Sequence, residues 1–312
     1  MKNTRRASMA ATALLGLCLT SPAQAQIFVA NNNDGNNTIG EYNLDGSSVN
    51  PSLISGLRLP IGLAVSGGNI FVADYGNGLA GNGAIGEYTT AGATVNASLV
   101  SGLYEPWGIA VSGGDIFVAN AGSGTIGEYT TAGATVNASL ISGLNGPTGI
   151  AVSGGNIFVA NWYSGTIGEY TMAGATVNAS LVSGLVEPDE IAVSGDDLFV
   201  ANDGNGAVGE YTTAGATVNA SLITGMGVVG QPDGLAVSGG DLFVAWWVGG
   251  TIGEYTTAGA TVNASLVTGL NGPAGLAVEP VPEPSTYALL AGGLGGWLLW
   301  RRRASWTRLT PH

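Results

Sequence analysis

Between residues 26 and 279, four short stretches recur in a fixed order of apolar and polar positions. The first stretch is apolar, as at residues 108–111 (Gly-Ile-Ala-Val), and the second is the apolar run 116–119 (Ile-Phe-Val-Ala). The third ends in Gly-Glu-Tyr, and the fourth is more polar, as at 135–140. The tyrosines of the third stretch are 46, 41, 41, 41 and 44 residues apart, at Tyr42, Tyr88, Tyr129, Tyr170, Tyr211 and Tyr255. Repeats of this length are typical of propellers and solenoids.

Each stretch has the pattern of a β-strand. The second is apolar without alternation, as expected for a strand buried on both faces between neighbouring units. The fourth suits an outer strand, and Gly-Gly and Ala-Gly pairs supply turns between the stretches. Residues 26–280 contain no helical apolar period. Four strands in each of six units predict an all-β, six-bladed propeller.

The two ends of the repeat array predict a closed ring. The array begins with a second stretch at Ile27 and ends with an additional first stretch at residues 275–278. We therefore expect strand 275–278 to complete the N-terminal blade. An open solenoid would instead need polar caps at both ends.

The inner stretches also resemble a known repeat. Residues 106–111 (Pro-Trp-Gly-Ile-Ala-Val) followed by 115–120 (Asp-Ile-Phe-Val-Ala-Asn) are similar to an NHL repeat, and the similarity extends over residues 26–279. The chain departs from the pattern at Ser112, where an Asp is usual, and in the basic residue often found before the third strand. The resemblance implies a binding platform, with enzymes a minority among related six-bladed propellers.

The N-terminus has the organisation of a secretory signal peptide over residues 1–25. Basic Lys2, Arg5 and Arg6 precede an apolar segment at 9–19, and small residues precede the expected cleavage between Ala25 and Gln26. The alternative is an uncleaved membrane anchor, but the apolar segment is short for one. Cleavage would remove the only cysteine, and with it any disulfide.

The C-terminal residues 280–312 resemble a PEP-CTERM sorting tail. Pro282, Glu283 and Pro284 precede an uncharged segment at 285–300, and Arg301, Arg302 and Arg303 follow it. The resemblance implies recognition by an exosortase and anchoring in the inner membrane by a short helix before transfer to the cell surface or matrix. Arginines after an apolar segment favour this orientation. The alternative is a buried globular helix.

Charge restricts the partners of the repeat domain. Of the chain's eight basic residues, only Arg58 lies between residues 26 and 279, where 20 of the 21 acidic residues lie. Such a domain repels phosphates and anionic headgroups, so we exclude nucleic acid as a partner.

The links between strands differ in how much they vary. Links between first and second strands, and between third and fourth, are nearly constant among the repeats. The other two kinds of link vary, and alternating strand direction places them together on one rim, which we call the variable face. This face collects aromatic and acidic residues, and the residue after each link proline should face the central mouth: Ile61, Trp107, Thr148, Asp189, Asp233 and Ala274.

Aromatic rings beside carboxylates suit sugar recognition. The candidate ligand-binding residues are Trp107, Trp162, Tyr163, Asp189, Glu190, Asp233, Trp246 and Trp247. We expect Trp246 and Trp247 to be exposed as a pair. The alternative is random divergence of duplicated loops, with some tryptophans only filling the channel.

Missing residue types limit the possible chemistry. The only histidine is His312, and the mature chain would lack cysteine, which removes the usual zinc ligands and catalytic bases. A carboxylate glycosidase using two of Asp189, Glu190 and Asp233 stays possible, as does a calcium-dependent lactonase-like site. Asp-rich loops at 196–197 and 203–205 leave calcium open. We predict a non-catalytic protein without a cofactor that binds an extracellular polysaccharide or surface protein. A passive structural role is the further alternative.

Overall fold

The computed structural model describes residues 25–32, 37–225 and 230–279, which all belong to one compact unit. The predicted sorting tail and the predicted signal peptide, apart from Ala25, lie outside these residues. Within the described part of the chain, no helix is long and apolar enough to cross a membrane.

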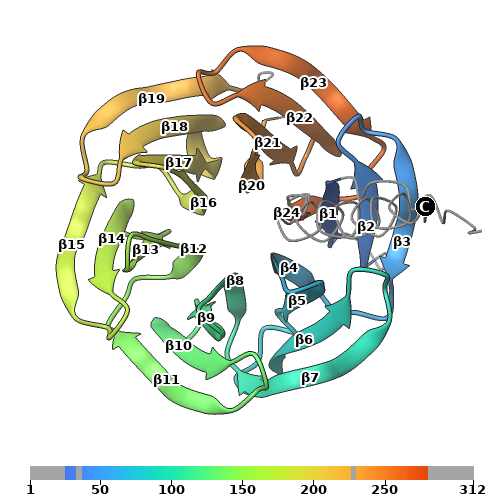
Figure 1. The fold of residues 1–312 in the computed structure, drawn as a ribbon. Coiled ribbons are helices and arrows are strands. Elements are labelled where there is room, and N and C mark those ends of the chain that lie inside the picture. The colour runs from blue at the N-terminus through green and yellow to red at the C-terminus, as the bar shows by residue number, and fades with distance from the viewer. Residues whose placement is uncertain (1–24, 33–36, 226–229, 280–312) are drawn as a thin grey trace, which may run out of the picture. The chain divides into compact units, whose positions relative to one another are not determined.

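The described residues form six four-stranded antiparallel sheets arranged around a central channel (Figure 1). The predicted six-bladed, all-β propeller is therefore confirmed. The only helical element among the described residues is the 3-10 turn η1 (Asp203–Asn205).

The strands occupy four positions from the channel outwards. The innermost strands are β24 (Pro273–Glu279), β4 (Pro60–Ser66), β8 (Pro106–Ser112), β12 (Pro147–Ser153), β16 (Pro188–Ser194) and β20 (Pro232–Ser238). The second strands are β1 (Gln26–Asn31), β5 (Asn69–Asp74), β9 (Asp115–Asn120), β13 (Asn156–Asn161), β17 (Asp197–Asn202) and β21 (Asp241–Trp246). The third strands are β2 (Thr38–Asn43), β6 (Gly83–Thr89), β10 (Thr125–Thr130), β14 (Thr166–Thr171), β18 (Ala207–Thr212) and β22 (Thr251–Thr256). The outer strands are β3 (Ser48–Ile54), β7 (Thr94–Leu103), β11 (Thr135–Ser142), β15 (Thr176–Ser183), β19 (Thr217–Thr224) and β23 (Thr261–Thr268).

The C-terminal strand closes the ring as predicted. β24 pairs antiparallel with β1, with Val278 opposite Ile27, and completes the blade β24-β1-β2-β3. In Figure 1 the red end of the chain therefore lies beside its blue end. The polar caps of an open solenoid are not needed, because every blade has two neighbours.

The hydrophobic core lies between adjacent blades. In β9, Ile116 and Val118 pack against the preceding blade, whereas Phe117 and Ala119 pack against the following one. The equivalent phenylalanine is almost fully buried in all six blades. This two-sided burial explains why the second stretch is apolar without alternation.

The inner strands approach one another closely at glycine. A Cβ atom at Gly275 of β24 would lie 2.0 Å from the carbonyl oxygen of Ile61 in β4. Four further inner strands have glycine at the equivalent position, and their Cβ atoms would lie 2.0 to 2.5 Å from a carbonyl oxygen of the next strand. The recurring glycine thus sets the width of the channel.

We expect Gly275→Ala to lower the free energy of unfolding by about 1–3 kcal/mol, because the methyl group overlaps the backbone of β4. Chemical denaturation of residues 26–279 measures this change. The matched control is Gly249→Ala, whose Cβ would have its nearest contact at 3.4 Å. A control that loses as much stability as Gly275→Ala would contradict the packing argument.

Candidate functional site

A β-bulge at the start of each inner strand directs one side chain towards the mouth of the channel. In β16, for example, Pro188 pairs with Asn202 and Ile191 with Val200, which leaves Asp189 and Glu190 in the irregular segment. Bulges commonly redirect side chains in this way. Five of the six predicted mouth positions line one pocket: Ile61, Trp107, Asp189, Asp233 and Ala274.

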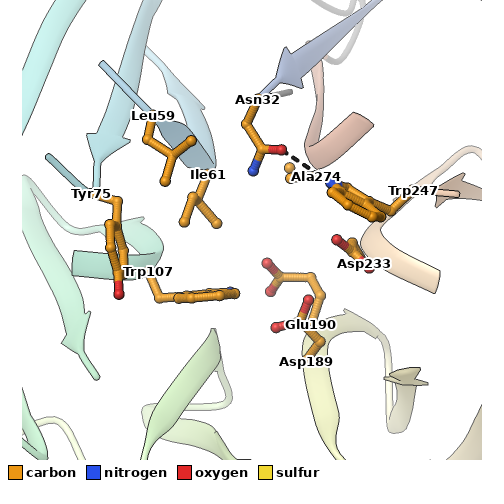
Figure 2. Close-up of a pocket in the computed structure, with 11 residues that line it drawn as sticks. Asn32, Leu59, Ile61, Tyr75, Trp107, Asp189, Glu190, Asp233, Trp247 and Ala274 are labelled. Atoms are coloured by element: carbon orange, nitrogen blue, oxygen red, sulfur yellow. Dashed lines mark hydrogen bonds between the residues drawn. The ribbon is translucent and has the colours of Figure 1, made fainter. Parts of the chain in front are cut away.

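This mouth pocket has a volume of about 360 Å³. Its other lining residues come from the variable links and the inner strands: Asn32, Leu59, Tyr75, Glu190, Trp247 and Gly275. Figure 2 shows Leu59, Ile61, Tyr75 and Trp107 on one side of the pocket, and the carboxyl groups of Asp189, Glu190 and Asp233 on the other, next to Trp247. We call these sides the aromatic wall and the acidic wall.

The aromatic wall is centred on Trp107 of β8, whose ring projects towards the acidic wall (Figure 2). The ring of Tyr75 packs edge-on against it, with the centroids 5.8 Å apart and the planes at 84°. Burial and a hydrogen bond to Glu105 raise the pKa of Tyr75 to about 12. Because Tyr75 is held by Glu105, it supports Trp107 in a defined orientation.

The acidic wall contains Asp189 and Glu190 of β16 and Asp233 of β20. Asp189 is only 4% exposed, and its Oδ1 atom accepts no hydrogen bond from the described residues. Glu190 is partly exposed to the pocket, and its Oε1 accepts the Ile191 N–H at 3.0 Å. A buried carboxyl oxygen without a donor is costly in its ionised form. A hydrogen bond with the Trp107 side chain lowers the pKa of Asp189, against the larger effect of burial.

The carboxyl groups of this wall hold protons more tightly than usual. Burial raises the pKa of Asp189 well above its ordinary value, and Asp233, Glu190 and Asp203 raise it further. Burial also raises the pKa of Asp233 and brings that of Glu190 to about 8. Arg58, the only basic residue between residues 26 and 279, does not line the pocket, so no basic side chain of the described residues offsets the charge of the cluster.

Trp247 and Asn32 close the pocket between the two walls. The Trp247 indole donates a hydrogen bond to Asn32 Oδ1 at 3.0 Å (Figure 2). The backbone N–H of Trp247 also donates to the Gln231 carbonyl at 2.9 Å. Trp247 is therefore fixed by two bonds, with its ring beside Asp233 in the figure.

The remaining predicted aromatic residues line a smaller, adjoining pocket of about 120 Å³. Trp162 and Tyr163 belong to it together with Thr148, the sixth mouth residue, and it shares Tyr75 and Trp107 with the mouth pocket. Tyr163 is 76% exposed. The structure thus distributes the predicted residues over two neighbouring pockets on the variable face.

The prediction that Trp246 is exposed together with Trp247 is wrong. Trp246 is 4% exposed and packs in the core between two blades, against residues such as Phe199 and Leu235. It is the last residue of β21, where alternation directs its side chain into the core and that of Trp247 away from it. Trp246 therefore does not line the mouth pocket.

Tyr75 and Gly275 were not among the predicted binding residues, and sequence reasoning did not single out Asn32 and Leu59 at all. Asn32 directly follows β1, the position that Trp247 occupies after β21. Leu59 directly precedes the proline that begins β4. Both lie in variable links, so listing the residues on either side of each strand end would have found them.

No three His, Cys, Asp or Glu side chains converge as metal ligands in the part of the chain that the structure describes. The loops at 196–197 and 203–205 likewise bring no such set together.

Comparison with known proteins identifies the tail and the fold. Residues 280–303 match the PEP-CTERM protein-sorting motif, which implies export and processing by an exosortase. No curated protein matches the chain.

Several solved structures share the propeller fold. One from the crystal structure of a nidogen/laminin complex has a TM-score of 0.67 at 16% identity and covers 81% of this chain and 98% of its own. A Bacteroides caccae protein of unknown function has a TM-score of 0.63 at 16% identity, over 82% and 99% of the two chains. Virginiamycin B lyase from Staphylococcus aureus has a TM-score of 0.54 at 18% identity, over 81% and 78%. At these identities the likeness shows the fold alone.

The two adjacent tryptophans should differ in their contribution to stability. We expect Trp246→Ala to lower the free energy of unfolding by about 3–5 kcal/mol, because it empties a core site. Trp247→Ala should lower the free energy of unfolding by only about 1–2 kcal/mol, because it removes a half-buried ring and one side-chain hydrogen bond. Urea denaturation of both variants checks this order, and equal losses would contradict the burial of Trp246.

The acidic wall should make stability depend on pH. A carboxyl group with a raised pKa binds more protons in the folded state, so its contribution to stability falls as pH rises between the unfolded and folded pKa values. For Glu190 this window runs from the ordinary 4.5 to about 8. Glu190→Gln should therefore gain stability relative to the unchanged protein across this window, as measured by denaturation at several pH values. Asp196→Asn, an exposed site on the opposite rim, is the control, and an equal gain there would contradict a local effect.

Proposed function

We propose that this protein is an exported, exosortase-sorted surface or matrix propeller that binds a glycan in its mouth pocket without catalysing a reaction. The sorting motif supports the location, since it implies export and a membrane-anchored C-terminal signal before processing. The mouth pocket supports the binding role. The observation that carries the proposal is the aromatic wall, fixed by Tyr75, opposite the carboxylates of β16 and β20.

A sugar fits both walls of the pocket. The C–H face of a pyranose packs on an aromatic ring such as that of Trp107, while carboxyl groups accept hydrogen bonds from hydroxyls. A volume of about 360 Å³ lies in the range of small-ligand sites. A flat protein surface would have less use for such a concave site, so the glycan is the better match of the two ligand classes.

Burial argues against the carboxylate hydrolase. A glycosidase needs one protonated acid and one ionised carboxylate at the same bond. In the mouth pocket, burial raises the pKa values of all three candidates, Asp189, Glu190 and Asp233. Raised pKa values suit the acid of such a pair, and no basic side chain of the described residues lines the pocket to favour the ionised partner that a nucleophile or base requires. The lyase among the structural neighbours nevertheless leaves activity to be tested, and turnover that disappears in Asp189→Asn and Asp233→Asn variants would establish the enzyme.

A glycan array with residues 26–279 tests the binding proposal. We expect binding that weakens at least about tenfold in Trp107→Ala, because the variant removes the stacking surface of the aromatic wall. Isothermal titration with the best glycan measures the change. Tyr104→Ala is the matched control, an exposed aromatic residue on the same face that lines neither pocket. A blank array for a cooperatively folded domain would overturn the glycan proposal, and a passive spacer would give that result.

A further inference from the structure

The repeat itself marks one residue of the mouth pocket as exceptional. At the close approach between inner strands, five blades carry glycine, because a Cβ atom would overlap the next strand: Gly62, Gly108, Gly149, Gly234 and Gly275. The sixth equivalent residue is Glu190, which follows the same link proline after one residue. A long side chain stands where the fold elsewhere tolerates no side chain. The exception places a carboxyl group in the lining of the mouth pocket, where the other five blades have no side chain.

The residue before it is equally unusual. The mouth position holds Ile, Trp, Thr or Ala in four blades, but acids at Asp189 and Asp233 in the neighbouring strands β16 and β20. The Oδ1 atom of Asp189 is buried without a donor among the described residues, and the side chain lines the pocket (Figure 2). An unsatisfied buried acceptor needs a donor from the ligand.

The charge of the pocket indicates which kind of hydrogen-bond donor the ligand carries. Three carboxyl groups gather on one wall, and none of the described basic side chains lines the pocket. The opposite wall presents the ring of Trp107, and Trp247 lies beside Asp233. Carboxylates with aromatic faces favour an ammonium group, which donates several hydrogen bonds and is attracted to the ring faces. An ammonium group also favours the ionised form of these buried carboxyl groups, which a neutral sugar does not.

We infer that the mouth pocket binds a sugar that carries a free, protonated amine, with the ammonium group against Asp189 and Glu190 and the sugar ring against Trp107. This inference rests on the proposed glycan-binding function and names the sugar class. It also explains why the protein retains an acidic cluster that lowers its stability at neutral pH.

Two dimers of glucosamine test the inference, because they differ only in the acetylation of their amines. Isothermal titration at pH 7 would compare the β1,4-linked glucosamine dimer with its di-N-acetylated form. We expect the free amine to bind at least about tenfold tighter. Asp189→Asn and Glu190→Gln should reduce this preference to about threefold or less, whereas Asp196→Asn, with the same charge change on the opposite rim, should retain it.

Glu190→Gly separates the structural role of this position from binding. The variant restores the residue of the other five blades, so its thermal midpoint should stay equal or rise while the preference for the free amine is lost. A variant that unfolds would point to a structural role, and Glu190→Gln, which keeps the shape of the side chain, would then decide whether the charge is needed.

Proton release gives a second readout. An ammonium group stabilises the ionised form of Asp189, which is surrounded by Glu190, Asp233, Asp203 and the Trp107 indole. Binding at pH 7 should therefore release protons, and titration in two buffers of different ionisation enthalpy counts them. Nonspecific attraction to the acidic surface would release none.

The outcomes separate the two proposals. Equal affinity for both dimers would overturn the inference and leave glycan binding intact. Binding of neither dimer, with other glycans positive on the array, would overturn the inference alone, whereas a blank array would overturn both. A lysine dipeptide that binds as tightly as the free-amine dimer would overturn the assignment to a sugar.

Discussion

The whole structure depends on the packing of each second strand between two neighbouring blades. Every blade has apolar side chains on both faces, so no blade is stable alone and the array must close. The pairing of β24 with β1 supplies the missing contact and removes both free ends. Once the ring is closed, the six inner strands meet around the channel, and their spacing is limited by the glycines at the close approach. These constraints leave only the links free to vary.

Because the core constrains the strands and leaves the links variable, a binding site would form on the rim where the variable links lie. The turns between first and second strands, and between third and fourth, are short and repeat almost unchanged. The links from outer to inner strands contribute a leucine to the core, as at Leu144 and Leu185, and the bulges that begin the inner strands place side chains around the mouth. Two walls of different chemistry arise because β8 contributes Trp107 while β16 and β20 contribute acids.

Most of the fold could be predicted from the sequence, because the repeats report the same local structure six times. The apolar second stretch indicated a strand buried on both faces, and the additional first stretch at residues 275–278 indicated the closure. The direction of a side chain at the end of a strand was harder to predict from the sequence than the strand itself. Trp246 and Trp247 are adjacent, and a boundary of one residue decides which is in the core and which lies at the pocket. The support of Trp107 by Tyr75 and the bond between Trp247 and Asn32 join separate blades, and no local pattern predicts such contacts.

Internal repetition also provides a test of function that needs no relatives. Where six copies share one fold, a residue that violates the packing rule of the other five must bring a compensating benefit or reduce stability. Glu190 stands at the position where the other five inner strands have glycine, and next to it the Oδ1 atom of Asp189 is buried without a donor among the described residues. A cationic group in the pocket would offset the charge of both carboxyl groups and would supply the donor that the Asp189 oxygen lacks. The two exceptions lie on one strand and face one cavity, which is why a ligand accounts for them better than divergence of duplicated loops.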